Sequence, residues 1–135
     1  MLLLKFAILV VFATFPFGYN NGQNVEALES KEFFENYFQE LQNGKILLID
    51  GRTAQMYANE HIENSINIDA DSENLLDLLQ DYLKEDSLFI YCTTIRRTNK
   101  IVGVLGEIYT GRVYYINDGL LGWKRNELPV VGVKE

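Results

Sequence analysis

Ile46-Leu47-Leu48-Ile49-Asp50-Gly51-Arg52 and Leu88-Phe89-Ile90-Tyr91-Cys92 are the two stretches of sequence that decide the fold. Each begins with an apolar run of strand length in which apolar and polar side chains do not alternate. Continuous apolarity is typical of a strand buried on both faces, as in a parallel sheet. Each run then ends in polar or reactive residues, and ligands of open α/β sheets gather beyond the carboxyl ends of strands. The sequence therefore predicts two buried strands with candidate functional residues where they end.

Helices are predicted around these strands because apolar side chains recur at helical spacing. Ser30 is expected to cap the first helix, and Asp71 or Ser72 the third. Strands that alternate with helices indicate βαβ units, so we predict an α/β fold with a mostly parallel central sheet of about five strands, flanked by helices on both faces. The expected helices are residues 31–42, a short helix followed by a turn within 53–65, a helix that reaches Leu83, residues 96–109 and residues 119–126. The further expected strands are residues 66–68, residues 113–116 and an edge strand at residues 130–131.

The first 22 residues are predicted to be a secretory signal peptide. Lys5 gives a short positive start, residues 6–15 are almost wholly apolar, and Pro16 and Gly18 interrupt the run. Cleavage is expected between residues 18 and 23, which would leave one domain over 30–135. The apolar stretch is short for a membrane span. We therefore expect a periplasmic or secreted protein with no membrane contact after cleavage, or a membrane-anchored one if the leader is retained.

Charge and composition exclude several classes of function. Acidic residues outnumber basic ones by 19 to 12, which gives a net charge of −7. Nucleic-acid binding needs a basic footprint, so no nucleic-acid partner is expected. The chain has one Cys and one His, 31 positions apart, and this pair forms no ligand cluster, so we expect no metal and no cofactor.

Cys92 is the only cysteine, so it cannot form a disulfide within the chain. It is either an inert, buried side chain or a reactive thiol. Its place between a strand and a helix favours the second, because amide groups at a helix N-terminus stabilise an anion. Arg96 and Arg97 add positive charge to an otherwise acidic chain, and a thiolate is the nucleophilic form of cysteine.

Three segments resemble the rhodanese family, in the family's order and at its spacings. Residues 46–68 are similar to its opening motif, (hydrophobic)-D-V-R-x-x-x-E-F/Y-x-x-G-H-I-x-G-A-x-N-I. Residues 92–98 (Cys-Thr-Thr-Ile-Arg-Arg-Thr) resemble its active-site loop, C-x-x-G-x-R-S, and residues 116–130 resemble its closing motif. The resemblance departs from the pattern at Gly51 and Asp118, which stand for a valine and a glycine. Ile95 replaces the loop glycine and would be strained if that position required positive φ.

This resemblance implies a sulfurtransferase in which Cys92 carries a sulfane sulfur from a donor such as thiosulfate to a thiol or to cyanide. The amides of the loop would hold the terminal sulfur, and Arg97 would steer an anionic donor. A protein sulfur acceptor is a further expected partner. Asp50 and Arg52 are expected to support the loop through hydrogen bonds or an ion pair. The implied site comprises Cys92 as nucleophile, the binding residues Thr93, Thr94, Ile95, Arg96, Arg97 and Thr98, and the supporting residues Asp50 and Arg52.

Two other functions stay open on sequence grounds. The chain could be a persulfide carrier or binding module without turnover. A small phosphatase is disfavoured by loop length, because that related branch has five residues between its cysteine and arginine, and Arg97 closes a loop with four. His61 could serve as a general base, but a thiolate that is already formed needs none, so a structural role is preferred.

Overall fold

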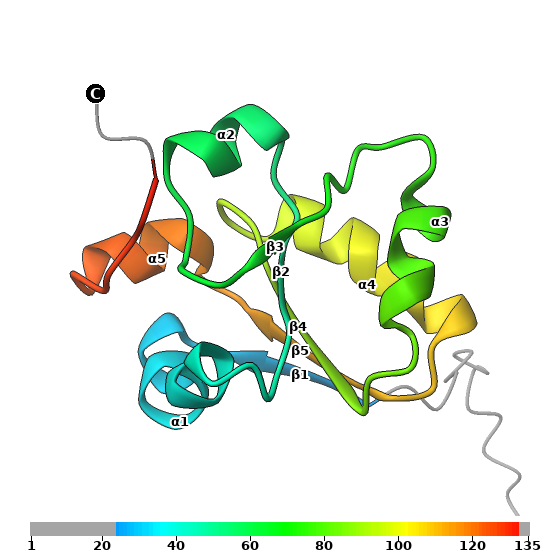
Figure 1. The fold of residues 1–135 in the computed structure, drawn as a ribbon, viewed down its shortest axis with the longest axis horizontal. Helices are drawn as coiled ribbons and strands as arrows, with labels where there is room; N and C mark the ends of the chain where they lie inside the picture. The colour runs from blue at the N-terminus through cyan, green and yellow to red at the C-terminus, as the bar shows by residue number, and fades with distance from the viewer. Residues whose placement is uncertain (1–23, 133–135) are drawn as a thin grey trace, which may run out of the picture.

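A five-stranded, wholly parallel sheet forms the centre of the protein (Figure 1). The computed structural model describes residues 24–132. The strand order is β1-β5-β4-β2-β3. The strands are β1 (Val25–Leu28), β2 (Leu48–Asp50), β3 (Ile66–Asn67), β4 (Ser87–Tyr91) and β5 (Arg112–Ile116). The helices are α1 (Ser30–Gln42), α2 (Ala54–Asn59), α3 (Leu75–Leu79), followed by a 3₁₀ turn (Gln80–Tyr82), α4 (Arg96–Ile108) and α5 (Gly119–Arg125).

The two continuous apolar runs are explained by burial on both faces of the sheet. In β2, Leu48 packs on the side of α1 and α5, whereas Ile49 packs on the side of α3 and α4. In β4, Phe89 and Tyr91 join the first of these cores and Ile90 joins the second. Successive side chains of a strand point to opposite faces, so a strand covered on both sides needs apolar residues at every position.

Helices cover both faces of the sheet, as predicted from the alternation of elements. Figure 1 shows α1 and α5 on one side and α3 and α4 on the other, with α2 beyond the carboxyl ends of the strands. Trp123 of α5 is fully buried beside Phe33 of α1, where their ring centroids lie 6.2 Å apart. Leu105 of α4 is fully buried in the opposite core. The predicted α/β fold class is therefore confirmed.

Strand β1 was not predicted from the sequence, and it lies upstream of residue 30, where the domain was expected to begin. Val25–Leu28 is too short to give a clear pattern, and only Leu28 is buried. The segment is held as a strand by its pairing with β5, in which Val25 lies opposite Val113 and Leu28 lies opposite Ile116. Conversely, the edge strand expected at residues 130–131 is wrong, because Val131 makes only an isolated antiparallel bridge with His61.

Both predicted helix caps differ from the structure. Glu29, not Ser30, precedes α1, and the cap comes from Asp118, whose carboxylate accepts hydrogen bonds from the Ser30 N–H (2.9 Å) and hydroxyl (2.7 Å). Neither Asp71 nor Ser72 caps α3, because that helix starts only after Asn74. Asp71 instead pairs with cations on α4.

The predicted signal peptide lies outside the described residues, so export stays a prediction. Within residues 24–132, no helix is long and apolar enough to cross a bilayer.

Candidate functional site

The candidate site lies where the loops after β2 and β4 separate. These strands are neighbours, with Ile49 paired to Ile90, but the chain leaves β2 toward β3 and leaves β4 toward β5. Connections that diverge in this way open a crevice at the carboxyl edge of a parallel sheet, which is where ligands of such folds bind. Asp50 ends β2, and Cys92 directly follows β4. The fold therefore brings Asp50 and Cys92, which the sequence predicted as site residues, to the same edge of the sheet.

The Cys92 loop is held from one side by the start of α5. The amide of Leu120 donates to the Cys92 carbonyl (2.8 Å), and the amide of Leu121 donates to the Thr93 carbonyl (3.2 Å). In a planar trans peptide the N–H points opposite to the C=O. The N–H groups of Thr93 and Thr94 are therefore turned away from α5. Cys92 itself is only 2% exposed.

Gly119 makes this approach of α5 to the loop possible. Its φ is +59°, in the left-handed region that favours glycine. A Cβ at this position would lie 2.4 Å from the Thr93 carbonyl oxygen and 2.7 Å from that of Cys92. Gly119 occupies the second glycine position of the family's closing motif, but its contact with the loop could not be predicted from neighbouring residues.

The supporting pair, Asp50 and Arg52, forms a buried ion pair at the end of β2. The Arg52 Nη2 lies 2.8 Å from Asp50 Oδ2 and its Nε lies 3.0 Å from Oδ1, with the two side chains 5% and 0% exposed. The guanidinium also donates to the Glu60 carbonyl (2.6 Å). Burial by itself lowers the pKa of Arg52, but the hydrogen bonds and charge of Asp50 outweigh burial and raise it, so the guanidinium stays protonated.

Asn67 joins this pair to β3, a role that the sequence did not reveal. Its side-chain amide donates to the carbonyls of Asp50 (3.2 Å) and Arg52 (2.8 Å). The matching asparagine of the family motif was the available signal. Tyr91 lies against the same pair, with its ring 5.9 Å from the Arg52 guanidinium carbon. Burial, and then the negative charge of Asp50, raise the pKa of Tyr91, so its hydroxyl stays protonated and can donate.

The three departures from the family pattern have structural explanations. Ile95 precedes α4 with a φ of −133°, which any residue adopts, so the strain considered for positive φ does not arise. At Gly51 a Cβ would lie 3.0 Å from the Ile101 side chain and 3.7 Å from the Arg97 Cβ, so glycine lets α4 pack closely on β2. Asp118 directs its carboxylate to Ser30.

The loop arginines meet an acidic partner that the sequence did not identify. Arg97 Nε and Arg96 Nη2 each lie 3.2 Å from Asp71 Oδ2, and Lys100 contacts the other carboxylate oxygen. The neighbouring cations lower the pKa of Asp71, with the Lys100 hydrogen bond contributing most. Arg97 is 18% exposed and Arg96 is 59% exposed, so Arg97 is the more enclosed of the two.

Thr98 lies in the first turn of α4 and is fully buried. Within the described part of the chain, its hydroxyl has no hydrogen-bond partner. An unpaired buried hydroxyl lowers the stability of a fold and is rare in native proteins. The Thr98 hydroxyl, at the base of the loop, is therefore unusual. No side chain caps α4 either, since Ile95 occupies the capping position. The amides of this first turn lack partners within the helix and can face an anion.

His61 has contacts that suit a structural role. Its ring stacks on Tyr57 with centroids 3.7 Å apart, and its Nδ1 lies 2.7 Å from the Tyr57 carbonyl oxygen. Its backbone forms the bridge with Val131. Among residues 24–132, no three His, Cys, Asp or Glu side chains are grouped as they would be around a metal ion.

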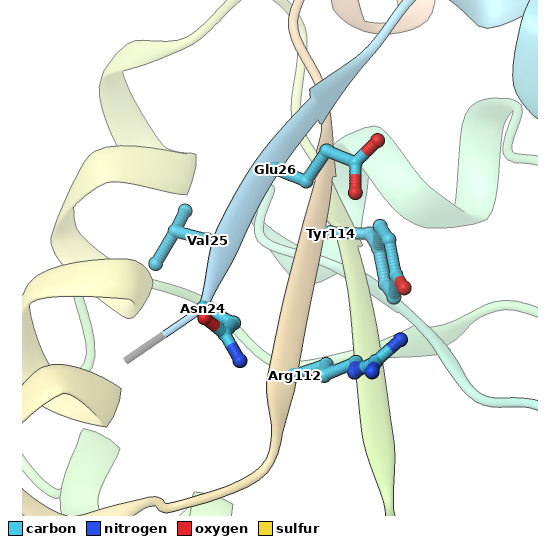
Figure 2. A pocket seen from close by; sticks show the side chains of 5 residues that line it. All are labelled: Asn24, Val25, Glu26, Arg112 and Tyr114. Carbon is cyan, nitrogen blue, oxygen red and sulfur yellow. The ribbon is translucent and has the colours of Figure 1, made fainter. Parts of the chain in front are cut away.

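Two hollows lie away from the cysteine. Figure 2 shows one, about 380 Å³ in volume, where the side chains of Glu26, Arg112 and Tyr114 lie on one side of the β1–β5 pair. Arg112 begins β5, so this hollow is at the opposite end of the sheet from Cys92. The other, about 430 Å³, runs between α3 and α4 and is lined in part by Lys100.

The chain is similar to proteins of a known family. The family described as the rhodanese-like domain matches residues 35–126 of the chain. The chain belongs to the rhodanese-like domain family. This membership supports a sulfurtransferase-family or sulfur-carrier module. The matched residues include Cys92, the α4 N-terminus and the Asp50–Arg52 pair.

Solved rhodanese-like structures share the fold at low sequence identity. A rhodanese-like domain protein from Staphylococcus aureus is 22% identical, covering 73% of this chain and 90% of that one, with a TM-score of 0.60. A Bacillus halodurans protein is 22% identical, covering 73% and 74%, with a TM-score of 0.61. An uncharacterized Buchnera aphidicola protein is 26% identical over 92 residues. The match covers 66% of this chain and 63% of that relative, so the chain spans less than two thirds of its length.

Replacing Arg52 by methionine should destabilise the fold strongly. Arg52→Met leaves the Asp50 carboxylate buried without its partner, and such a change costs about 3–5 kcal/mol in free energy of unfolding. The double variant Asp50→Leu/Arg52→Met should recover part of this loss. Urea denaturation followed by circular dichroism measures both. The exposed pair Lys31–Glu35 supplies the control, because Lys31→Met should change stability by about 0.5 kcal/mol or less. A loss no larger than this control would contradict the buried-pair interpretation.

Adding a methyl group at Gly119 should disturb both the fold and the loop. We expect Gly119→Ala to cost at least about 1 kcal/mol from positive φ alone, and more because the Thr93 carbonyl must move. Gly103→Ala is the matched control, since a Cβ there meets no atom within 4 Å, and a helical glycine-to-alanine change stabilises by about 0.5–1 kcal/mol. Thermal melts and the rate of Cys92 alkylation report the two effects. Equal melts for both variants would show that α5 does not constrain the loop.

Proposed function

We propose that this protein is a sulfurtransferase that carries a sulfane sulfur on Cys92 as a persulfide. The observation that carries the proposal is the position of Cys92, which is buried at the carboxyl end of β4 and is joined by a three-residue loop to α4, whose N-terminus has no side-chain cap. Amides of the loop and of a helix N-terminus can face an anion at such a position, and the nucleophile of cysteine chemistry is the thiolate. Family membership supports sulfur as the group transferred.

The proposed reaction has two displacement steps. The Cys92 thiolate attacks the outer sulfur of thiosulfate, a new S–S bond forms, and the bond to the sulfonate sulfur breaks. Sulfite leaves with the electron pair, and Cys92 holds the transferred sulfur as a persulfide anion. An acceptor thiolate, or cyanide, then attacks that terminal sulfur and regenerates the Cys92 thiolate. The charges balance in both steps, and neither step needs an oxidant or a metal.

The loop offers groups suited to hold the persulfide anion. The amides of Thr93 and Thr94 face away from α5, whose own amides bind the carbonyls on the other side. Oriented amides stabilise an anion without reorganising during the reaction. We assign Arg97 to the approach of an anionic donor, because it is the more enclosed of the two loop arginines.

A persulfide carrier without its own turnover is the second candidate function. It would use the same cysteine and loop, receive sulfur from a partner protein, and pass it to another. The ion pairing of Arg96 and Arg97 with Asp71 favours this candidate, because it occupies cations that a small anionic donor would use. The phosphatase alternative gains no support, since Arg97 closes a loop of sulfurtransferase length.

Incubation with thiosulfate separates these candidates. A sulfurtransferase should gain about 32 Da on Cys92, the mass of one added sulfur, and release sulfite in equal amount. Intact-protein mass spectrometry and a sulfite assay measure the two products. Cys92→Ser is the matched control and should show neither. If thiosulfate gives no adduct but a small-molecule persulfide does, the protein is a carrier. If neither donor modifies Cys92, the proposed function is wrong.

Thr98→Val should separate stability from chemistry. The threonine hydroxyl is buried without a partner, so its removal should leave the free energy of unfolding unchanged or raise it. If that hydroxyl donates to the persulfide or its thiolate precursor, persulfide formation should slow about tenfold, as expected for the loss of a hydrogen bond to a charged group. Rapid-quench mass spectrometry gives the rate. An unchanged rate would remove Thr98 from the proposed site.

A further inference from the structure

Asp71 brings one carboxylate against three cations of the candidate site. Its Oδ2 lies 3.2 Å from both Arg96 Nη2 and Arg97 Nε, and its Oδ1 contacts Lys100 Nζ. Together these four side chains carry a net charge of two, since three positive charges face one negative charge. The same arginines are the cations closest in sequence to Cys92, so Asp71 occupies the groups that would attract an anionic sulfur donor.

The backbone places Asp71 there, so the contact does not depend on a flexible surface side chain alone. Ile68 and Ala70 donate hydrogen bonds to the carbonyls of Asp50 (3.0 Å) and Gly51 (3.1 Å), at the end of β2. The amide of Asp71 then donates to Asp69 Oδ1 at 2.9 Å. Ile68 and Ala70 are buried, which fixes the segment against the core. The carboxylate is thereby tethered beside the loop at a high effective concentration.

We infer that Asp71 is a specificity-determining residue that selects against strongly charged sulfur donors. The inference rests on the proposed function of Cys92 and specifies its donor. A dianion such as thiosulfate must compete with the tethered carboxylate for Arg97, and it is repelled by that carboxylate in proportion to its own charge. A monoanionic thiosulfonate, in which an organic group replaces one sulfonate oxygen, is repelled half as strongly.

Both donors undergo the same balanced step. The Cys92 thiolate attacks the terminal sulfur of the thiosulfonate, the S–S bond forms, and an organic sulfinate leaves with the electron pair of the broken bond. Because the cluster keeps a net positive charge, Asp71 reduces the advantage that a dianionic donor has over a sulfane donor with a single negative charge. Asp71 acts through the cations, so it is a positioning residue and takes no part in bond making.

Donor kinetics test the selectivity. For wild type, Asp71→Asn, Asp71→Glu and Asp77→Asn, kcat and KM are measured with thiosulfate and with methanethiosulfonate. Asp71→Asn should raise kcat/KM for thiosulfate about fivefold, mainly by lowering KM, and for methanethiosulfonate about twofold, as expected for one removed charge. Asp71→Glu should stay close to wild type. Asp77 lies on α3, is exposed and makes no contact with the loop cations, so Asp77→Asn controls for net charge.

A second measurement does not depend on sulfur transfer. Iodoacetate and iodoacetamide alkylate the same thiolate but differ by one negative charge, so the ratio of their rates at Cys92 reports the local potential. Asp71→Asn should raise the iodoacetate-to-iodoacetamide ratio about twofold, and the rise should shrink in ~1 M salt, where the Debye length falls to about 3 Å. Asp77→Asn should leave it unchanged. Circular dichroism confirms that each variant is folded.

The outcomes are distinguishable. If the alkylation ratio rises in Asp71→Asn but no donor forms a persulfide, the proposed function fails while Asp71 is still shown to set the charge of the site. If persulfide forms and both the donor preference and the alkylation ratio are unchanged, the inference about Asp71 is overturned and the proposed function stands. A rise of equal size in Asp77→Asn would also overturn it, since the effect would then come from overall charge.

Discussion

The hydrogen bonds that α5 donates to the Cys92 and Thr93 carbonyls are the constraint on which the rest of the site depends. They fix the direction of two peptide planes, and this turns the amides of the loop to its other side. They also need Gly119, because any side chain at that position would meet the same carbonyls. A loop of few residues therefore receives its conformation from a helix nearly thirty positions away in the sequence.

The end of β2 lies at the same edge of the sheet as the Cys92 loop and is held by its own hydrogen bonds. The Asp50–Arg52 pair is buried and shares its hydrogen bonds with Glu60 and Asn67, so no charge there is left unpaired. Gly51 lets α4 approach the end of β2 closely. Asp50, Arg52 and Leu120 are buried, so the residues on both sides of the Cys92 loop belong to the packed core.

The sequence predicted most of the fold and the place of the cysteine, because those features depend on local pattern. The apolar runs at 46–49 and 88–91 and the helical spacing in α1 and α4 can be read from neighbouring residues. Contacts between distant segments could not be read in this way. Asp71 lies 26 positions from Arg97, and Asp118 lies 88 positions from Ser30, so nothing local marks either as a partner. Strand β1 forms through its pairing with β5, and four residues are too few for a sequence pattern to predict that pairing.

The position of β1 at the edge of the sheet has a consequence for shortened versions of the protein. β5 reads Arg-Val-Tyr-Tyr-Ile and is rich in residues that favour strands. Within the described residues 24–132, its outer row of amides and carbonyls is covered by residues 24–28. A chain that began at residue 30 would leave that row bare, and bare edges of apolar strands recruit strands from other molecules. By pairing with β5, residues 24–28 cover groups on which a strand of another molecule could otherwise pair.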